Sequence, residues 1–247
     1  MSVSRKYGRT YHYGFSLGTT SDDRINHEWE VDIKKLKQVI DLEKMDGENQ
    51  CLNEFGIFAR SHAAPTRNPW SEFLKEKHAM IQNDLKENDL EIFGENLYAI
   101  HSIIYPKLDE HFKVFAIRCK DKWLGWEEVK WYCDIFDFRT VPEIRIYNPN
   151  DFTAKEIEKF VLTNSNEPSF YGSLDLSGVE CTKEGIVTRN FEEFDVNNFK
   201  ENVFKNVRKN HVATDEHWVR NWKRAPLIHE QKIKKDGEEG NKTEIQG

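Results

Sequence analysis

A lysine at position 44 has neighbours that suit covalent chemistry at an amine. It stands in the run Lys44-Met-Asp-Gly47, directly after the apolar-rich stretch 39–43. A lysine amine becomes nucleophilic once it loses its proton, and burial or nearby charges control that loss. Gly47 permits a tight turn and a close approach of the backbone to a ligand. The four letters alone are a weak signal, because an exposed turn with a surface lysine reads the same way.

Other residues along the chain have side chains suited to ionic or aromatic contacts. Arg60 carries a planar guanidinium, which suits a bidentate contact with an anion but also a surface salt bridge. Glu95 and Glu184 each stand beside a glycine. Phe115 lies in an alternating stretch, where an aromatic ring either stacks on a base or packs in the core.

The charge distribution adds a basic stretch near the end of an acidic chain. The 247 residues carry 36 Lys and Arg against 43 Asp and Glu, a net charge of −7, which excludes a globally basic nucleic-acid binder. Residues 199–224 nevertheless hold seven cations against three anions, including Lys200, Lys205 and Arg208. Such a stretch suits a polyphosphate or a nucleic acid. A solvated helix face has the same composition.

Periodicity predicts mixed α and β structure around these positions. We expect strands over 39–43, 50–58, 90–98, 111–118, 141–147 and 184–189. We expect helices over 69–86, 127–138 and 153–163, whereas 199–207 fits either state. The irregular interleaving favours an α+β domain over a regular βαβ winding. Residues 225–247 are polar and poor in core residues, so we expect them to form a disordered tail after a domain spanning 1–224.

Composition also excludes other classes of protein. The chain has no apolar run long enough for a membrane span and no apolar leader after Met1, so we expect a cytoplasmic or otherwise intracellular protein without membrane contacts. The four scattered cysteines include no CxxC pair, which makes a zinc ribbon or a disulfide framework improbable. Nothing in the sequence implies a protein partner.

The order of the motifs resembles that of the covalent nucleotidyltransferase superfamily, the polynucleotide ligases and mRNA capping enzymes. Within it, the chain looks like an ATP-dependent RNA ligase. The resemblance rests on 43–49, 93–98, 184–187 and the cluster around Lys205, and extends from about Arg9 to Trp218. The segments Thr19-Thr-Ser-Asp-Asp23 and 210–218 also look like those of stand-alone bacterial and phage RNA ligases.

The resemblance implies a role for each matching residue. Lys44 matches the nucleophile that forms a lysyl-AMP phosphoramidate with ATP, and Asp46 of the same motif is expected to contact the ATP or AMP. Arg60 matches an arginine that contacts AMP or the RNA strand, and Phe115 matches the aromatic that stacks on adenine. Glu95 matches a carboxylate for the ribose or a metal. Glu184 matches a carboxylate for Mg²⁺ or Mn²⁺, a cation that would neutralise phosphate charge.

The last motif departs from the family pattern. The family usually has two lysines two residues apart, whereas here Lys205 is flanked in that spacing by Val203 and Val207. Lys205 is the expected phosphate ligand, and Arg208 or Lys200 is expected to replace the missing lysine and to contact RNA.

The resemblance implies an adenylyltransferase domain with antiparallel sheets around a nucleotide cleft. DNA ligases and capping enzymes carry an OB-fold after the last motif, and the 38 residues that follow Lys209 are too few for one, so we expect none. The implied activity joins RNA 5′-phosphate and 3′-hydroxyl ends through lysyl-AMP and an RNA-adenylate, with ATP, Mg²⁺ or Mn²⁺, and RNA ends as ligands. A DNA ligase or a GTP-using mRNA capping guanylyltransferase shares the Lys-x-Asp-Gly motif. A module that binds ATP or RNA without turnover would be a third class, which the intact Lys44, Glu95 and Glu184 disfavour.

Overall fold

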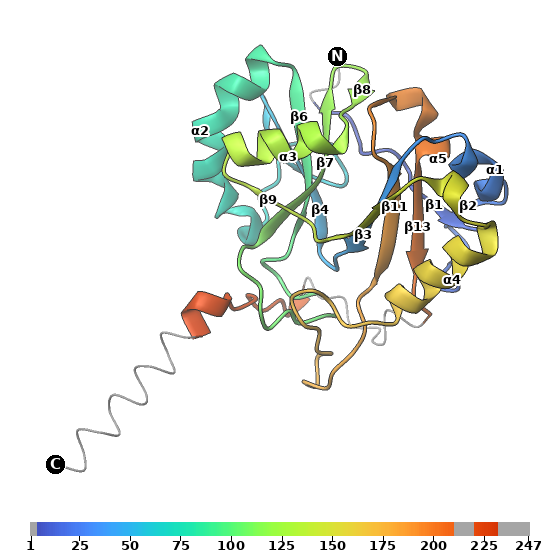
Figure 1. Cartoon of the computed structure of the whole chain (residues 1–247). Coiled ribbons are helices and arrows are strands. Elements are labelled where there is room, and N and C mark those ends of the chain that lie inside the picture. Colours follow the sequence, from blue (N-terminus) through green and yellow to red (C-terminus); the bar gives the residue numbers. More distant parts are fainter. Residues whose placement is uncertain (1–3, 210–219, 232–247) are drawn as a thin grey trace, which may run out of the picture.

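Two β-sheets face each other in the computed structural model, which describes residues 4–209 and 220–231 (Figure 1). The six strands of the first sheet are, in spatial order, β10 (Glu143–Tyr147), β3 (Val39–Lys44), β11 (Gly185–Asn190), β13 (Val203–Val207), β1 (Tyr11–Tyr13) and β2 (Ile25–Asn26). The path through the second sheet is β12 (Phe194–Asp195), β8 (Lys122–Trp123), β7 (Phe112–Cys119), β6 (Leu90–Asn96), β4 (Glu48–Asn53) and β5 (Gly56–Ala59), with β9 (Arg139–Thr140) beside β7.

The long strands of both sheets pair antiparallel, as predicted. Among the described strands, parallel pairing occurs only where at least one partner is very short, namely β1 with β13 and with β2, and β9 with β7. Within the described part of the chain both sheets have open edges, at β10 and β2 in one and at β12 and β5 in the other. Neither sheet therefore closes into the barrel of an OB-fold.

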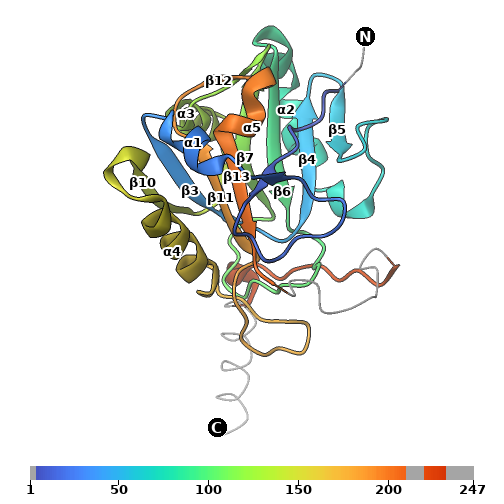
Figure 2. The same cartoon turned by 90° about the vertical axis from the view of Figure 1, so that its right-hand side faces the viewer.

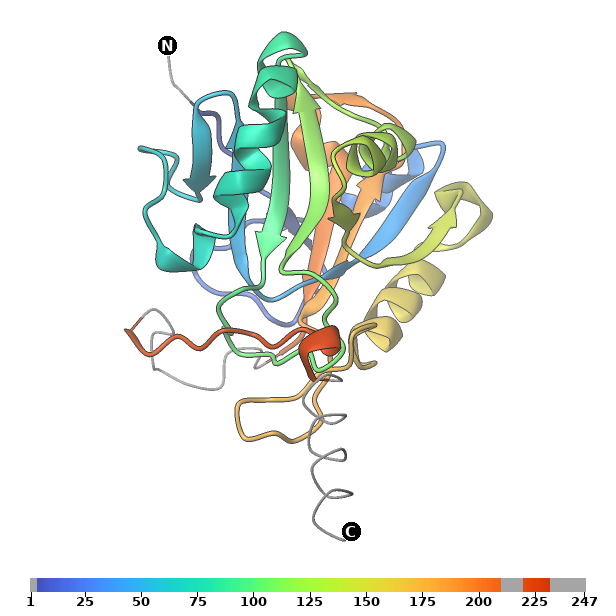
Figure 3. The ribbon, with the colours of Figure 1, turned by 90° about the vertical axis from the view of Figure 1, so that its left-hand side faces the viewer.

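Helices cover the outer face of each sheet. α1 (Trp29–Lys34) and α4 (Ala154–Ser165) bury Ile33 and Val161 against the first sheet. α2 (Leu74–Glu87) and α3 (Trp126–Ile135) cover the second sheet, and Figure 3 shows α2 running across its strands. The short α5 (Phe199–Asn202) leads directly into β13. Among the described residues, no helix is long and apolar enough to cross a membrane.

An aromatic cluster fills the space between the two sheets at the end away from Lys44 and Glu95. Its buried members come from both sheets and from α5: Cys51, Phe58, Phe93, Ala116, Trp123, Phe194, Phe199 and Val203. Tyr7, from the N-terminal segment, makes ring contacts at 5.0 Å with Phe115, Trp123 and Phe199. This packing fixes the distance between the two sheets at one end and leaves the strand ends that carry Lys44 and Glu95 at the other.

The polar residues of β3 are buried although their alternation predicts an exposed face. Asp41 and Glu43 share a face of β3 with Val39, which packs in the cluster that includes α1 and α4, so they face covering structure instead of solvent. Asp41 accepts hydrogen bonds from Arg145 Nε at 2.8 Å and Thr188 Oγ1 at 2.5 Å, and Glu43 accepts one from the Phe170 N–H at 2.9 Å. Both oxygens of Asp41 and one of Glu43 are thus hydrogen-bonded, whereas Oε1 of Glu43 has no partner among the described residues.

Most predicted elements are present with shifted boundaries. The strand expected over 50–58 is two strands, β4 and β5, and the helix expected over 69–86 begins as a 3₁₀ turn at Pro69–Ser71 before α2. Residues 199–207, which fit either a helix or a strand, form α5 and then β13. The segment before α1 contributes the two short strands β1 and β2, which the sequence pattern did not predict.

Residues 225–231 do not behave as the tail predicted for 225–247. Ala225 is buried, and its carbonyl lies 2.8 Å from His111 Nε2. The Ile228 N–H donates to the Leu108 carbonyl at 2.8 Å. Packed chain therefore continues beyond the expected boundary at residue 224. Residues 232–247 lie outside the described residues.

Candidate active site

Lys44 lies at the end of β3 and faces the space between the two sheets. Leu42 and Ile40, two and four residues earlier, point the same way by strand alternation, and Lys44 pairs with Gly185 at the start of β11. Its Nζ atom lies 2.5 Å from Oε1 of Glu184, and the two side chains are 26% and 10% exposed. The structure therefore places the predicted nucleophile and one predicted metal ligand in direct contact.

Glu95 approaches the same lysine from the second sheet. It is near the end of β6, and its Oε1 accepts a hydrogen bond from the Gly47 N–H at 3.1 Å. A Cβ atom on Gly47 would lie 2.5 Å from the Asn96 carbonyl oxygen, so only glycine permits this approach. The close contact that we expected Gly47 to offer a ligand is thus made, within the chain, to β6.

Asp46 anchors the turn that follows Lys44. Its Oδ2 atom accepts hydrogen bonds from the Ser102 N–H and hydroxyl, both at 2.8 Å, and from the Ile103 N–H at 2.9 Å. The Asp46 N–H donates to the Tyr105 hydroxyl at 2.8 Å. These bonds tie the turn to the loop after β6. The structure thus supports a holding role for Asp46, and its predicted contact with AMP stays a prediction.

The carboxylates around Lys44 control its protonation. Burial disfavours the charged amine, yet Glu184 and Glu95 outweigh burial and hold the pKa of Lys44 above its usual range. Burial also raises the pKa of Glu95 to about 8, although Lys44 opposes that shift. Lys44 is therefore protonated at neutral pH.

Lys205 lies on the face of β13 that is turned towards the second sheet. Phe204 and Asn206 point to the helix-covered face, where Asn206 donates to Ser165 of α4. Burial and the nearby Lys44 lower the pKa of Lys205, which places the two amines in one electrostatic site. Val207 shares the face of Lys205 and is buried, so a valine occupies the position of the family's second lysine.

Phe115 occupies an irregular position in β7. Phe93 of β6 pairs with Ala116 and Gly94 with Val114, so Phe115 is the extra residue of a β-bulge. Its ring meets Tyr7 edge-on, and its carbonyl accepts a hydrogen bond from Arg189 at 3.3 Å. The ring is partly exposed, and adenine stacking on it stays a prediction.

The other predicted cations are arranged differently. Arg60 is exposed just after β5, whose Ala59 pairs with Gln50 near the start of β4, at the same sheet end as Glu95. Arg208 follows β13, and its Nε donates to the Lys183 carbonyl at 3.1 Å. Both therefore lie near the strand ends that carry the site.

Lys200 is not brought to the site. It lies in α5, before β13 begins, whereas Lys44 aligns with the far end of that strand. Its ammonium lies 3.6 Å from Glu28, and it faces the ring of Tyr11. Lys200 therefore cannot replace the missing lysine beside Lys205, which corrects that prediction.

The donor set suits a divalent cation that arrives with a nucleotide. Among residues 4–209 and 220–231, no group of three or more His, Cys, Asp or Glu side chains could hold a metal alone. Glu184 and Glu95 nevertheless converge on Lys44. Mg²⁺ is commonly bound by one or two carboxylates together with substrate phosphates, which these two residues could provide.

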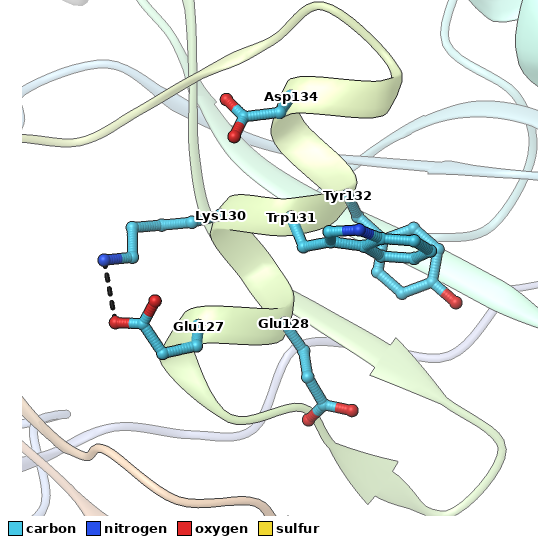
Figure 4. Close-up of a pocket in the computed structure, with 6 residues that line it drawn as sticks. All are labelled: Glu127, Glu128, Lys130, Trp131, Tyr132 and Asp134. Atoms are coloured by element: carbon cyan, nitrogen blue, oxygen red, sulfur yellow. Dashed lines mark ion pairs between the residues drawn. The ribbon is translucent and has the colours of Figure 1, made fainter.

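A separate shallow depression lies on helix α3 (Figure 4). Trp131 and Tyr132 point to one side of the helix there, and Lys130 forms an ion pair with Glu127. This depression shares no residue with the site around Lys44.

Two residues that contact Lys205 were not assigned from the sequence. Asp23 lies in the segment 19–23 that resembles RNA ligases, and His12 lies in β1. Asp23 and Lys205 are separated by 182 positions. Local patterns carry no information on such a contact.

The fold is a two-sheet α+β domain that holds a lysine between two carboxylates. A family model described as RNA ligase matches residues 37–207, more than two thirds of the chain. The chain therefore belongs to the RNA ligase family. No curated protein sequence matches it significantly.

Solved structures support the same fold. An apo mutant of Naegleria gruberi RNA ligase has a TM-score of 0.52 at 15% identity, over 81% of this chain and 58% of that one. Another mutant, solved with ATP and Mn, has a TM-score of 0.51 at 16% identity, over 82% and 60%. An archaeal ATP-dependent RNA ligase has a TM-score of 0.49 at 15% identity, over 84% and 49%. This chain thus spans half to three-fifths of those proteins' length.

Proposed function

We propose that this chain is an ATP-dependent RNA ligase that joins 5′-phosphate and 3′-hydroxyl ends through a lysyl-AMP intermediate. The observation that carries the proposal is the convergence of Lys44, Glu184 and Glu95, with Lys205 in the same electrostatic site. This set contains a nucleophile, two carboxylates for a cation and a lysine for a phosphate. Membership of the RNA ligase family, and the ATP and Mn in the related Naegleria structure, support the assignment.

Each residue then has a chemical task. Lys44 attacks the α-phosphorus as the free amine once its proton has passed to solvent, so that an N–P bond forms, the bond from the α-phosphorus to the bridging oxygen breaks and pyrophosphate leaves. Lys205 binds the α-phosphate and offsets its developing charge. Glu184 and Glu95 would hold Mg²⁺ or Mn²⁺, and a cation bound there would supply charge neutralisation at the phosphates. Phe115 stacks on the adenine, and Asp46 holds the turn.

The two later steps place RNA at the same strand ends. AMP passes to the RNA 5′-phosphate, and the 3′-hydroxyl then displaces AMP in line, with positioning and charge neutralisation as the main contributions. Arg60 is exposed near Glu95 and has the donor geometry for a phosphate of the RNA, and Arg208 follows Lys205. Residues 210–219 of the basic stretch lie outside the described residues.

Incubation with α-labelled nucleotide tests the proposal. ATP with Mg²⁺ or Mn²⁺ should leave label on the protein that survives a denaturing gel, and excess chelator should prevent it. GTP in place of ATP should leave no label. Label from GTP alone would instead identify a capping-type guanylyltransferase, and label in full amount despite the chelator would contradict the metal assignment.

A further inference from the structure

The loop between β1 and β2, residues 14–24, closes over the end of β13 (Figure 2). The Gly18 N–H donates to the Val207 carbonyl at 2.9 Å, and the Val207 N–H donates to Ser16 Oγ at 3.2 Å. A Cβ atom on Gly18 would lie 2.4 Å from the Arg208 carbonyl oxygen, so the loop approaches the strand as closely as a glycine permits. The loop is therefore fixed against the strand that carries Lys205.

This loop delivers the carboxylate of Asp23 to Lys205. Oδ1 of Asp23 accepts a hydrogen bond from Lys205 Nζ at 3.2 Å. Oδ2 accepts hydrogen bonds from the Thr20 N–H and the Thr20 hydroxyl, both at 3.0 Å. Although burial opposes its charge, Thr20 and Lys205 keep the pKa of Asp23 well below the usual range. Both oxygens of this anion are engaged, so its position is set by the loop.

His12 supports the same contact from β1. It is 1% exposed and pairs with Lys205 across the β1–β13 ladder. Its Nε2 lies 3.0 Å from Asp23 Oδ1 and its Nδ1 lies 2.8 Å from Ser16 Oγ. Burial and Lys205 lower the pKa of His12, so the imidazole is neutral at pH 7 and adds no repulsion. Ser16, His12, Asp23 and Lys205 form one connected polar row.

Lys205 needs such an anchor because a second amine lies nearby. Lys44 and Lys205 repel each other, and a lysine side chain that is free to rotate would turn towards solvent. An ammonium group has three N–H donors, and Asp23 takes only one of them. Within residues 4–209 and 220–231, two donors therefore remain for a phosphate. The contact with Asp23 therefore orients the Lys205 ammonium and still leaves it able to bind a phosphate.

We propose that Asp23 is a positioning residue, which holds the Lys205 ammonium where the α-phosphate of ATP binds. The proposal rests on the proposed function and adds to it the use of the segment 19–23. Asp23 does not touch the nucleotide. It acts through Lys205, and the two hydrogen bonds from Thr20 hold it in place.

Single-turnover labelling by ATP tests this role. Asp23→Ala should slow formation of lysyl-AMP by about 100-fold, the loss typical of a misplaced catalytic group. Asp22→Ala is the matched control, because Asp22 is the exposed neighbour in the same loop, and its rate should stay within about twofold of wild type. Asp23→Asn keeps the shape and a hydrogen-bond acceptor without the charge and should fall between the two.

A double-mutant cycle separates positioning from a general loss of structure. In a Lys205→Ala background, Asp23→Ala should slow labelling by less than about twofold, because the group it positions is already absent. ATP affinity, measured by equilibrium binding in a Lys44→Ala background, should show the same dependence on Lys205. The proposal would be overturned if Asp23→Ala slowed labelling by the same factor in the wild-type and Lys205→Ala proteins, or if the Asp23→Ala enzyme were faster than wild type. Wild-type protein that takes no label would overturn the proposed function itself.

Discussion

Replacement of Lys44 by alanine should abolish covalent labelling by ATP completely. Lys44 is the proposed nucleophile, and the reaction requires an amine at the end of β3, beside Glu184. The fold should tolerate the change, because the side chain is 26% exposed at a strand end. Labelling on a denaturing gel, together with a thermal melt of each variant, measures both effects.

Two further variants make this prediction specific. Lys44→Arg keeps a positive charge next to Glu184, but a guanidinium does not lose its proton at neutral pH, so this variant should also take no label. Lys37→Ala removes an exposed lysine just before the same strand and should label as wild type does. Label on Lys44→Ala at the wild-type level would show that another residue is the nucleophile.

Replacement of Glu184 by glutamine should slow lysyl-AMP formation by at least about 100-fold. Two opposing effects decide the result. Loss of the carboxylate lowers the pKa of Lys44, because Glu184 is the strongest of the charges that raise it, and a lower pKa frees more amine at neutral pH. Loss of a cation ligand leaves the phosphate charge uncompensated, and we expect this second effect to dominate.

The two effects differ in how they depend on metal and pH. If Glu184 holds the cation, half-maximal labelling by Glu184→Gln should need more Mg²⁺ or Mn²⁺ than wild type. Its rate should also become independent of pH at lower pH than that of wild type, since the Lys44 pKa has fallen. Glu192→Gln, an exposed change beyond the other end of β11, should alter neither property. Faster labelling by Glu184→Gln would show that the carboxylate only restrains the amine.

The local parts of this site can be predicted from the sequence. Alternation placed Lys44 at a strand end, and the glycine after Asp46 marked a turn, because both signals depend on neighbouring residues alone. The order of the motifs then linked Glu95, Glu184 and Lys205 to that lysine. The structure brings these side chains together from four strands or strand ends of two sheets.

Features that depend on tertiary contacts could not be predicted in this way. The burial of Asp41 follows from the cover that α1 and α4 give to its face of β3, and its partner Arg145 is 104 residues away. Lys200 belongs to the same basic stretch as Lys205, yet the intervening change from helix to strand places it at the other end of the sheet. The bulge at Phe115 depends on its pairing with β6.

The central claim, that Lys44 passes AMP to RNA for end joining, is tested most directly by a chase without ATP. Protein labelled with α-labelled ATP is freed of nucleotide and mixed with nicked RNA duplex, or with single-stranded RNA, each bearing a 5′-phosphate and a 3′-hydroxyl. The account predicts that label leaves the protein, appears on RNA as the adenylate and then as AMP, and that joined strands accumulate up to the amount of labelled protein. Label that stays on the protein with both RNAs, or that leaves only with a nicked DNA duplex, would contradict it.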